Sequence, residues 1–200
     1  MAGIKLTKNE LKKQKDGLKR FQRYLPTLIL KKQQLQMVIR QVEVRERELS
    51  EKKDLLYGQL SAWIQVFGEE IPLEQYLSVK EIHEETGNIA GVDIPQFSGI
   101  SFTENKYDLF EFPLWVDAGL DMLKSLLELD AQITVLRKQI ALLGEELRIT
   151  TQRVNLFEKV KIPTTKENIR KIQIYLGDQQ TAAVVRGKIA KSNMMKVTES

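Results

Sequence analysis

The stretch LILKKQQLQMVIRQVEVRERELSEKKDLLYGQLSAWIQVF, residues 28–67, places apolar side chains at every seventh position. One line of this repeat contains Leu28, Leu35, Val42, Leu49, Leu56 and Trp63. A second line, offset by three or four residues, contains Leu11, Leu18, Leu25, Ile39, Leu60 and Phe67. A repeat of about 3.5 residues keeps one narrow stripe facing a partner helix over many turns. The stretch therefore predicts one arm of a coiled coil.

The partner helix is predicted near the other end of the same chain. Its apolar residues follow the same alternation: Leu126, Leu129, Ile133, Leu136, Ile140, Leu143, Leu147, Val154 and Phe157. Thr150 is the one polar step, and Gly119 and Gly144 weaken the helix without ending it. A stretch of different composition separates the arms, so we expect them to fold back on each other. The predicted fold class is mainly α, a long antiparallel two-helix coiled coil.

The middle segment, residues 68–114, is punctuated by glycine and proline. Two short alternating runs, Ser78–His83 and Ile89–Ile94, flank the polar residues 84–88. This pattern predicts a small β-hairpin with a loop of several residues. Because a lone hairpin is marginally stable, we expect it to pack against the arms or a partner.

Two prolines fall inside the predicted arms. Pro26 removes one backbone hydrogen bond and is expected to bend or divide the first helix. Pro163 interrupts the second arm, and Thr164 or Thr165 is then expected to cap a continuation. If the arms align end to end, residue i faces residue 182 − i, which brings both prolines to nearly one level. We therefore expect a hinge at Pro26 and Pro163.

The domain organisation follows from these boundaries. We expect an N-terminal arm at 1–67, a middle segment at 68–114, a C-terminal arm at 115–186 and a polar tail at 187–200. The seam contains three charged positions, Lys32, Glu46 and Lys53, which cost stability but restrict register. For Glu46 and Lys53, pairing across the seam and simple exposure to solvent are both open.

Composition limits the class of protein. The 200 residues include no cysteine, so neither a disulfide framework nor a cysteine metal site is expected. No apolar run approaches the ~20 residues needed to cross a bilayer, and residues 1–9 lack an apolar signal core. We expect a cytoplasmic protein without direct membrane insertion.

The net charge of +4 hides an uneven distribution. Residues 1–50 contain 13 Lys or Arg against 5 Asp or Glu, and residues 153–200 contain 10 against 4. Residues 68–114 contain 2 against 10. If the arms fold back, both basic ends lie together and the acidic bend lies at the opposite pole. The simple interpretation is solvated faces, and the sharper one is that the poles meet different partners.

The sequence lacks the common signs of catalysis. It contains no phosphate-binding loop, no dinucleotide-binding glycine motif and no zinc-protease motif. Its single histidine, His83, has no cluster of metal ligands nearby and is expected on the hairpin surface. We therefore expect no catalytic residues, no cofactor and no metal.

A specific block appears in the second arm. Residues 153–158, RVNLFE, followed by Val160 and Ile162-Pro163, resemble the R-V-N-A-L-E-x-V-x-I-P signature of the D subunit of V-type and A-type rotary ATPases. Residues 88–95 are similar to that family's N-[IV]-x-G-V-x-[IV]-P stretch. The basic residues Arg186, Lys188 and Lys191 resemble its terminal segment. The likeness covers nearly the whole chain with matching order and spacing.

The resemblance implies the central-stalk rotor shaft of such an ATPase, coupling ATP hydrolysis or synthesis to ion translocation. It implies contact with the alternating A and B subunits of the head, with the F subunit of the ATPase and with the subunit that connects to the membrane ring. The implied location is cytoplasmic and peripheral to the membrane, and the implied role is not catalytic. The candidates for contact with the head are Arg153, Asn155, Arg186, Lys188 and Lys191.

Two other functions are compatible with a basic coiled coil. One is nucleic-acid binding, although the basic residues lack interleaved aromatic side chains or a known binding motif. The other is a scaffold protein, which would share the coiled coil but would not copurify with ATPase subunits. Salt-sensitive binding to DNA or RNA would indicate the first alternative.

Overall fold

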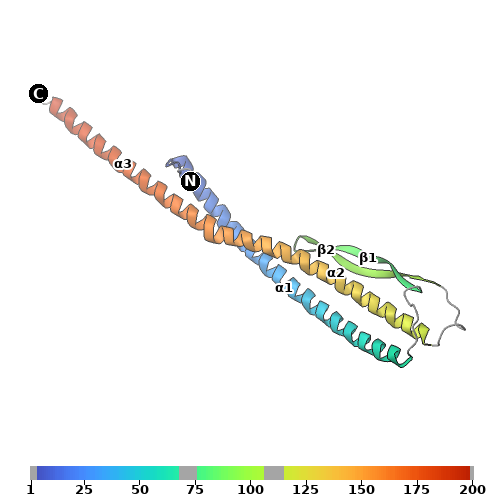
Figure 1. The fold of residues 1–200 in the computed structure, drawn as a ribbon. Coiled ribbons are helices and arrows are strands. Elements are labelled where there is room, and N and C mark those ends of the chain that lie inside the picture. Colours follow the sequence, from blue (N-terminus) through green and yellow to red (C-terminus); the bar gives the residue numbers. More distant parts are fainter. Residues whose placement is uncertain (1–3, 68–75, 106–114, 199–200) are drawn as a thin grey trace. The chain divides into compact units, whose positions relative to one another are not determined.

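Figure 1 shows the computed structural model, which describes residues 4–67, 76–105 and 115–198. The elements are α1 (Lys8–Phe67), β1 (Leu77–Ile89), β2 (Val92–Glu104), α2 (Val116–Asn155), the π-helix η2 (Leu156–Lys161) and α3 (Ile162–Thr198). This order confirms a mainly α fold with long N-terminal and C-terminal helices and a two-stranded antiparallel hairpin between them.

The chain divides into two compact units. We call Lys31–Ile149 the central unit, and Met1–Leu30 together with Thr150–Ser200 the terminal unit. Each unit combines a part of α1 with a part of the second arm. Segments from opposite ends of the sequence therefore lie together within each unit.

Helix α1 begins behind a side-chain cap. Thr7 Oγ1 accepts a hydrogen bond from the backbone N–H of Glu10 at 3.2 Å, and the Thr7 carbonyl accepts one from Leu11 at 3.0 Å. Threonine followed three residues later by glutamate is the spacing of a capping box. The local sequence thus fixes where the helix starts.

Helix α1 is not divided at Pro26, and it continues as one helix of 60 residues. Proline removes the donor that would reach the carbonyl of Gln22 and crowds that carbonyl. Pro26 is exposed, so the freed carbonyl remains on the water-facing side. The Thr27 hydroxyl also donates to the carbonyl of Tyr24 at 2.8 Å. The local cost is about 3 kcal/mol, which a long packed helix tolerates.

Charged side chains connect α1 and α2 within the central unit. The pairs are Lys31 Nζ–Glu146 Oε1 at 2.6 Å, Arg137 Nε–Glu46 Oε1 at 2.8 Å and Lys53 Nζ–Asp130 Oδ1 at 2.5 Å. Partner numbers fall along α2 as they rise along α1, so the arms are antiparallel. Glu46 and Lys53 pair across the arms, which decides between the two interpretations left open by the sequence.

In the terminal unit, the rings of Phe21 and Phe157 lie with centroids 5.4 Å apart. Val154 and Ile172 are buried nearby in sequence, on either side of η2. Aromatic pairs at this separation contribute about 0.5–1.5 kcal/mol beyond the area that they bury. This contact joins residues 136 positions apart, so the terminal unit also pairs the two ends of the chain.

The second arm passes Pro163 through a π-turn. Within η2 the helix is wider than an α-helix, and the N–H of Ile162 donates to the carbonyl of Phe157, five residues earlier. Proline offers no N–H and would crowd the carbonyl of Lys159 in a regular α-helix. One turn with hydrogen bonds between residues five apart accommodates the missing N–H and the bulky ring without ending the helix.

The expected cap after Pro163 is wrong. Thr164 and Thr165 lie inside α3 rather than at a new helix start. Thr165 is buried, and its hydroxyl donates to the carbonyl of Lys161 at 2.6 Å. The threonine satisfies a carbonyl of the preceding turn instead of a free N–H of a following one. Helix α3 also continues through Gly187 to Thr198, past the expected end of the arm.

The hairpin turns later than expected. Ile89 pairs with Val92, so the turn consists of Ala90 and Gly91, with φ values of 53° and 77°. Positive φ at both central residues is the requirement of a type I′ turn. The expected loop at residues 84–88 is therefore wrong, because these residues belong to β1 and pair with residues 93–97.

Asn88 explains why a polar segment precedes this turn. Its Oδ1 accepts a hydrogen bond from the N–H of Gly91 at 3.1 Å. Its Nδ2 donates to Asp93 Oδ1 at 2.6 Å on the facing strand. The side chain of Asn88 thus holds both the turn and the facing strand.

The hairpin lies beside α2, as Figure 1 shows, and its turn end packs on both helices. Ile94 is buried between Leu35 of α1 and Leu143 of α2. The Gln139 side chain donates to the carbonyl of Pro95 at 2.5 Å. At the other end of the hairpin, Leu77 is buried in a second cluster with Trp115, Val116 and Leu120. The hairpin therefore adds a third layer to the central unit.

Gly91→Ala tests the turn. We expect this change to destabilise the central unit by about 1 kcal/mol, because a Cβ is strained at φ 77° even where space is open. Gly58→Ala is the matched control, since Gly58 is helical and exposed and its added methyl also meets nothing. The control should stabilise α1 by ~0.5–1 kcal/mol. Urea unfolding followed by circular dichroism measures both, and equal effects would contradict the turn assignment.

Charge reversal tests the pairing of the arms. Glu46→Arg should lower the free energy of unfolding by about 0.5–1 kcal/mol, because it faces Arg137 with a like charge. Adding Arg137→Glu should restore most of the loss. The effects should shrink in 1 M salt, where the screening length is about 3 Å. Strictly additive effects in the double variant would show that the two side chains do not interact.

Candidate functional site

The described residues contain no group of three or more His, Cys, Asp or Glu side chains placed to hold a metal ion. His83 lies exposed on β1, as expected, with Nε2 2.6 Å from the Ser101 hydroxyl oxygen. No helix among the same residues has the length and apolar character of a membrane span. The exposed side chains of each unit are the candidates for contact with partners.

The twelve positions predicted to form the seam are all buried or half-buried. They are Leu28, Leu35, Val42, Leu49, Leu56, Leu129, Ile133, Leu136, Ile140, Leu143, Leu147 and Val154. Leu35 and Leu143 have no exposed surface at all. The half-buried members keep part of their surface accessible.

The five basic or amide residues predicted to contact a partner are all exposed in the terminal unit, but they form two groups. Arg153 and Asn155 lie in the last turn of α2, directly before η2. Arg186, Lys188 and Lys191 lie on α3. About 30 helical residues separate the groups, or ~45 Å at 1.5 Å per residue. The structure does not bring the five side chains into one cluster.

The end of α3 is exposed on every side. All residues from 177 to 195 are exposed, including the apolar Val184, Val185 and Ile189. Val184 and Val185 are neighbours, so they project about 100° apart around the helix axis. Apolar side chains all round a helix indicate burial by surrounding protein. Together with Arg186 and its neighbours, they make a surface that is both basic and apolar.

Local ion pairs account for the pKa shifts on the exposed faces. Hydrogen bonds from Arg148 lower the pKa of Glu145, and hydrogen bonding to Lys171 lowers the pKa of Glu167. Both pairs span one helical turn and are exposed to solvent. Such pairs support helix formation and leave the chemistry of the surface unchanged.

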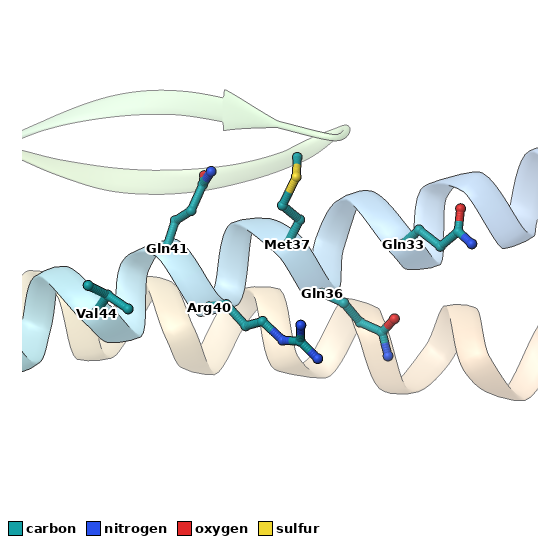
Figure 2. A pocket seen from close by; sticks show the side chains of 6 residues that line it. All are labelled: Gln33, Gln36, Met37, Arg40, Gln41 and Val44. Carbon is teal, nitrogen blue, oxygen red and sulfur yellow. The ribbon is translucent and has the colours of Figure 1, made fainter.

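Open surfaces on the central unit were not predicted from the sequence. Figure 2 shows a shallow, open surface whose lining comes from one exposed face of α1. Met37 and Gln41 project on the side of the hairpin, whereas Gln36 and Arg40 project toward α2. In the sequence, the only sign of this surface is that Met37 and Val44 are apolar residues seven apart that lie outside the seam.

Comparison with known proteins identifies the family. A family model for the ATP synthase D subunit matches residues 10–192. The V-type ATP synthase D subunit of Borreliella burgdorferi is 55% identical over 196 residues, covering 98% of this chain and 97% of the relative. That of Chlamydia trachomatis serovar L2 is 34% identical over 201 residues, covering 98% of each. The resemblance seen in the sequence is confirmed, and the chain belongs to the family of ATP synthase D subunits.

Proposed function

We propose that the chain is the central rotor shaft of a V-type rotary ATPase. In this role it couples ATP hydrolysis or synthesis in the head to ion translocation across the membrane. Membership of the D-subunit family over nearly the full length supports this function. The shaft acts through contacts and performs no bond chemistry.

The observation that carries the proposal is the pairing of the two arms within each unit. A shaft that transmits torque must resist bending and twisting, and two packed helices resist both better than one. Phe21 and Phe157 join the arms in the terminal unit. Ion pairs such as Glu46–Arg137 join them in the central unit.

The proposed partners differ in chemistry along the chain. The basic and apolar end of α3 suits a socket formed by the A and B subunits of the head. The remaining partners are the F subunit, beside the shaft, and the subunit that connects to the membrane ring. The acidic middle of the sequence suits a partner of the opposite charge. The proposed location is cytoplasmic and peripheral to the membrane.

Coupling follows from asymmetry of the shaft surface. Arg153, Asn155 and the basic residues of α3 present different chemistry in different directions around the helices. An asymmetric shaft contacts three similar interfaces differently and biases their conformations by its differential affinity. Within this role we assign residues 1–67 and 115–186 to the arms, 68–114 to the middle segment and 187–200 to the polar tail. Pro26 and Pro163 are proposed hinge positions.

Removing the basic residues of α3 tests the head contact. In Arg186→Ala, Lys188→Ala and Lys191→Ala combined, we expect ion transport per ATP hydrolysed to fall severalfold in the reconstituted complex. The reason is that each side chain supplies a charge-assisted contact at the apolar tip.

The matched control removes the same charge from the central unit by replacing Arg47, Lys80 and Arg148, which are also exposed. Its coupling should stay near the wild-type value. If the α3 variant assembles and couples as well as the control, the assignment of these three residues to the head contact is wrong. Stoichiometric recovery of A, B and F subunits with the wild-type chain tests the shaft role itself.

A further inference from the structure

The hairpin is a sheet of two strands, so each strand has one edge that pairs with its neighbour and one outer edge. The register shows which residues use which edge. Ile89 and Val92 flank the two-residue turn, and in such a hairpin the flanking residues exchange hydrogen bonds with each other. Because successive residues alternate, Gly87 also points its N–H and C=O toward β2, whereas Thr86 points them outward.

Two observations on β2 support this alternation. Pro95 is the partner of Thr86 and has no N–H, which fits a pair that exchanges no hydrogen bonds. The Pro95 carbonyl instead accepts a hydrogen bond from the Gln139 side chain of α2. The outer edge of β2 is therefore closed by α2 at this point.

The outer edge of β1 is open. All residues from 78 to 86 are exposed, whereas most residues of β2 from 92 to 102 are buried or half-buried. The residues of β1 whose N–H and C=O groups point outward are Ile82, Glu84, Thr86 and Asn88. They cover ~20 Å at about 3.4 Å per residue. A row of unpaired N–H and C=O groups on an edge strand is a template for another strand.

The irregularities of the ladder set the limits of this open edge. Lys80 is an extra residue on β1, without a partner on β2. A bulge and a lysine commonly protect an edge from pairing, so Lys80 marks one end of the open edge. The second irregularity places its extra residue, Ser98, on β2 instead. The regular part of β1 therefore runs from Glu81 to the turn.

The side chains along the open edge are acidic. Glu84 is already paired with Lys138 at 2.7 Å. Glu85 accepts a hydrogen bond from the neutral Ser98 hydroxyl at 2.8 Å, and no described cation forms an ion pair with Glu85 or Glu81. Glu81 and Glu85 are four residues apart, so they lie on one face of β1 with a spacing of ~14 Å. Opposite charges on facing residues of neighbouring strands stabilise the pair, and like charges destabilise it.

We infer that the outer edge of β1 receives an antiparallel third strand from another protein, an extended segment with two cations four residues apart. The two cations face Glu81 and Glu85. The three residues between them face Ile82, His83 and Glu84, where β-branched side chains such as valine and threonine fit an exposed strand surface. Main-chain hydrogen bonds supply the affinity, and the two ion pairs supply the specificity.

A second copy of the chain is disfavoured as the occupant. Two β1 strands that pair antiparallel around His83 would place Glu81 of each copy opposite Glu85 of the other, and these like charges repel. The acidic edge thus opposes self-association and selects a basic strand. The inference goes beyond the proposed function, because it concerns a strand partner of the hairpin and holds for the isolated chain.

Hydrogen exchange of single amides in the isolated full chain, followed by NMR, tests the open edge first. The outward amides of Glu84 and Thr86 should exchange at least tenfold faster than the amides of Glu85 and Gly87, which bond to β2. Equal rates in the two sets would show that the outer edge is not free, and would overturn the inference.

A peptide then serves as the probe. Its sequence is Thr-Lys-Val-Thr-Val-Lys-Thr with blocked ends, at millimolar concentration. One control has glutamate in place of both lysines. The other keeps the charges but carries N-methyl groups on both valines, which removes the N–H groups that face Ile82 and Glu84. We expect the basic peptide to slow exchange at these two residues at least fivefold and both controls to slow it less than twofold. Equal protection by the basic and acidic peptides, or protection by neither, overturns the inference.

Two sets of variants separate hydrogen bonding from charge. Thr86→Pro removes an outward N–H without breaking a bond to β2, and Thr86→Val is its matched control. We expect protection by the basic peptide to be lost in the first and kept in the second. The combined change Glu81→Lys and Glu85→Lys should reverse the preference, so that the acidic peptide protects. Slow exchange at Gly87 shows that the hairpin is intact in each variant. An unchanged preference after charge reversal contradicts the assigned pairing.

The last measurement uses the reconstituted ATPase, with exchange over residues 81–88 followed by mass spectrometry. We expect exchange at least tenfold slower than in the isolated chain. Because the chain contains no cysteine, His83→Cys provides a single cross-linking site, which should reach an extended basic segment. Exchange as fast as in the isolated chain overturns the inference and leaves the shaft role intact. Failure of the wild-type chain to assemble counts against the shaft role alone, since the peptide measurements do not depend on assembly.

Discussion

The burial of one narrow stripe on each arm is the constraint on which the rest of the structure depends. Neither arm has enough apolar surface on its other faces to form a core with itself. The stripe must therefore be covered by a segment far away in the sequence, as when Phe21 meets Phe157. Closing so long a loop costs conformational entropy, which only a contact repeated over many turns offsets. The heptad repeat supplies that repetition.

The ion pairs and the apolar seam perform different tasks. Partly exposed pairs such as Glu46–Arg137 contribute only about 0.2–1 kcal/mol each. An apolar seam alone permits the arms to slide by a heptad at little cost, because the repeat presents similar side chains again. A charge placed at a seam position opposes such a slip. The polar positions therefore reduce stability slightly and fix the register in which Leu35 meets Leu143 and the hairpin.

The sequence predicted the elements that depend on periodicity and missed those that depend on local geometry. Helix α1 and the second arm followed from the heptads, because burial of a stripe is a property of spacing. The predicted turn came too early in the chain, because residues 84–88 have the polar and glycine residues typical of a loop. Alanine, the residue at position 90, rarely adopts positive φ. Pro163 gave no sign of whether the helix would break or widen, since both relieve the same clash. Of the candidate site, single exposed residues were predictable, but the hollow between α1, α2 and the hairpin was not, because three separate segments line it.

The two units bury their apolar side chains to different extents, and this difference bears on function. The central unit has a third layer, since Ile94 fills the space between Leu35 and Leu143. The end of α3 has no such layer, and Val184, Val185 and Ile189 stay exposed. A helix of that composition gains free energy when it enters an apolar surrounding, about 25 cal/mol for each Å² covered. The chain therefore keeps one region stable by its own packing and leaves another to be completed by contact, which is the division that the proposed shaft role requires.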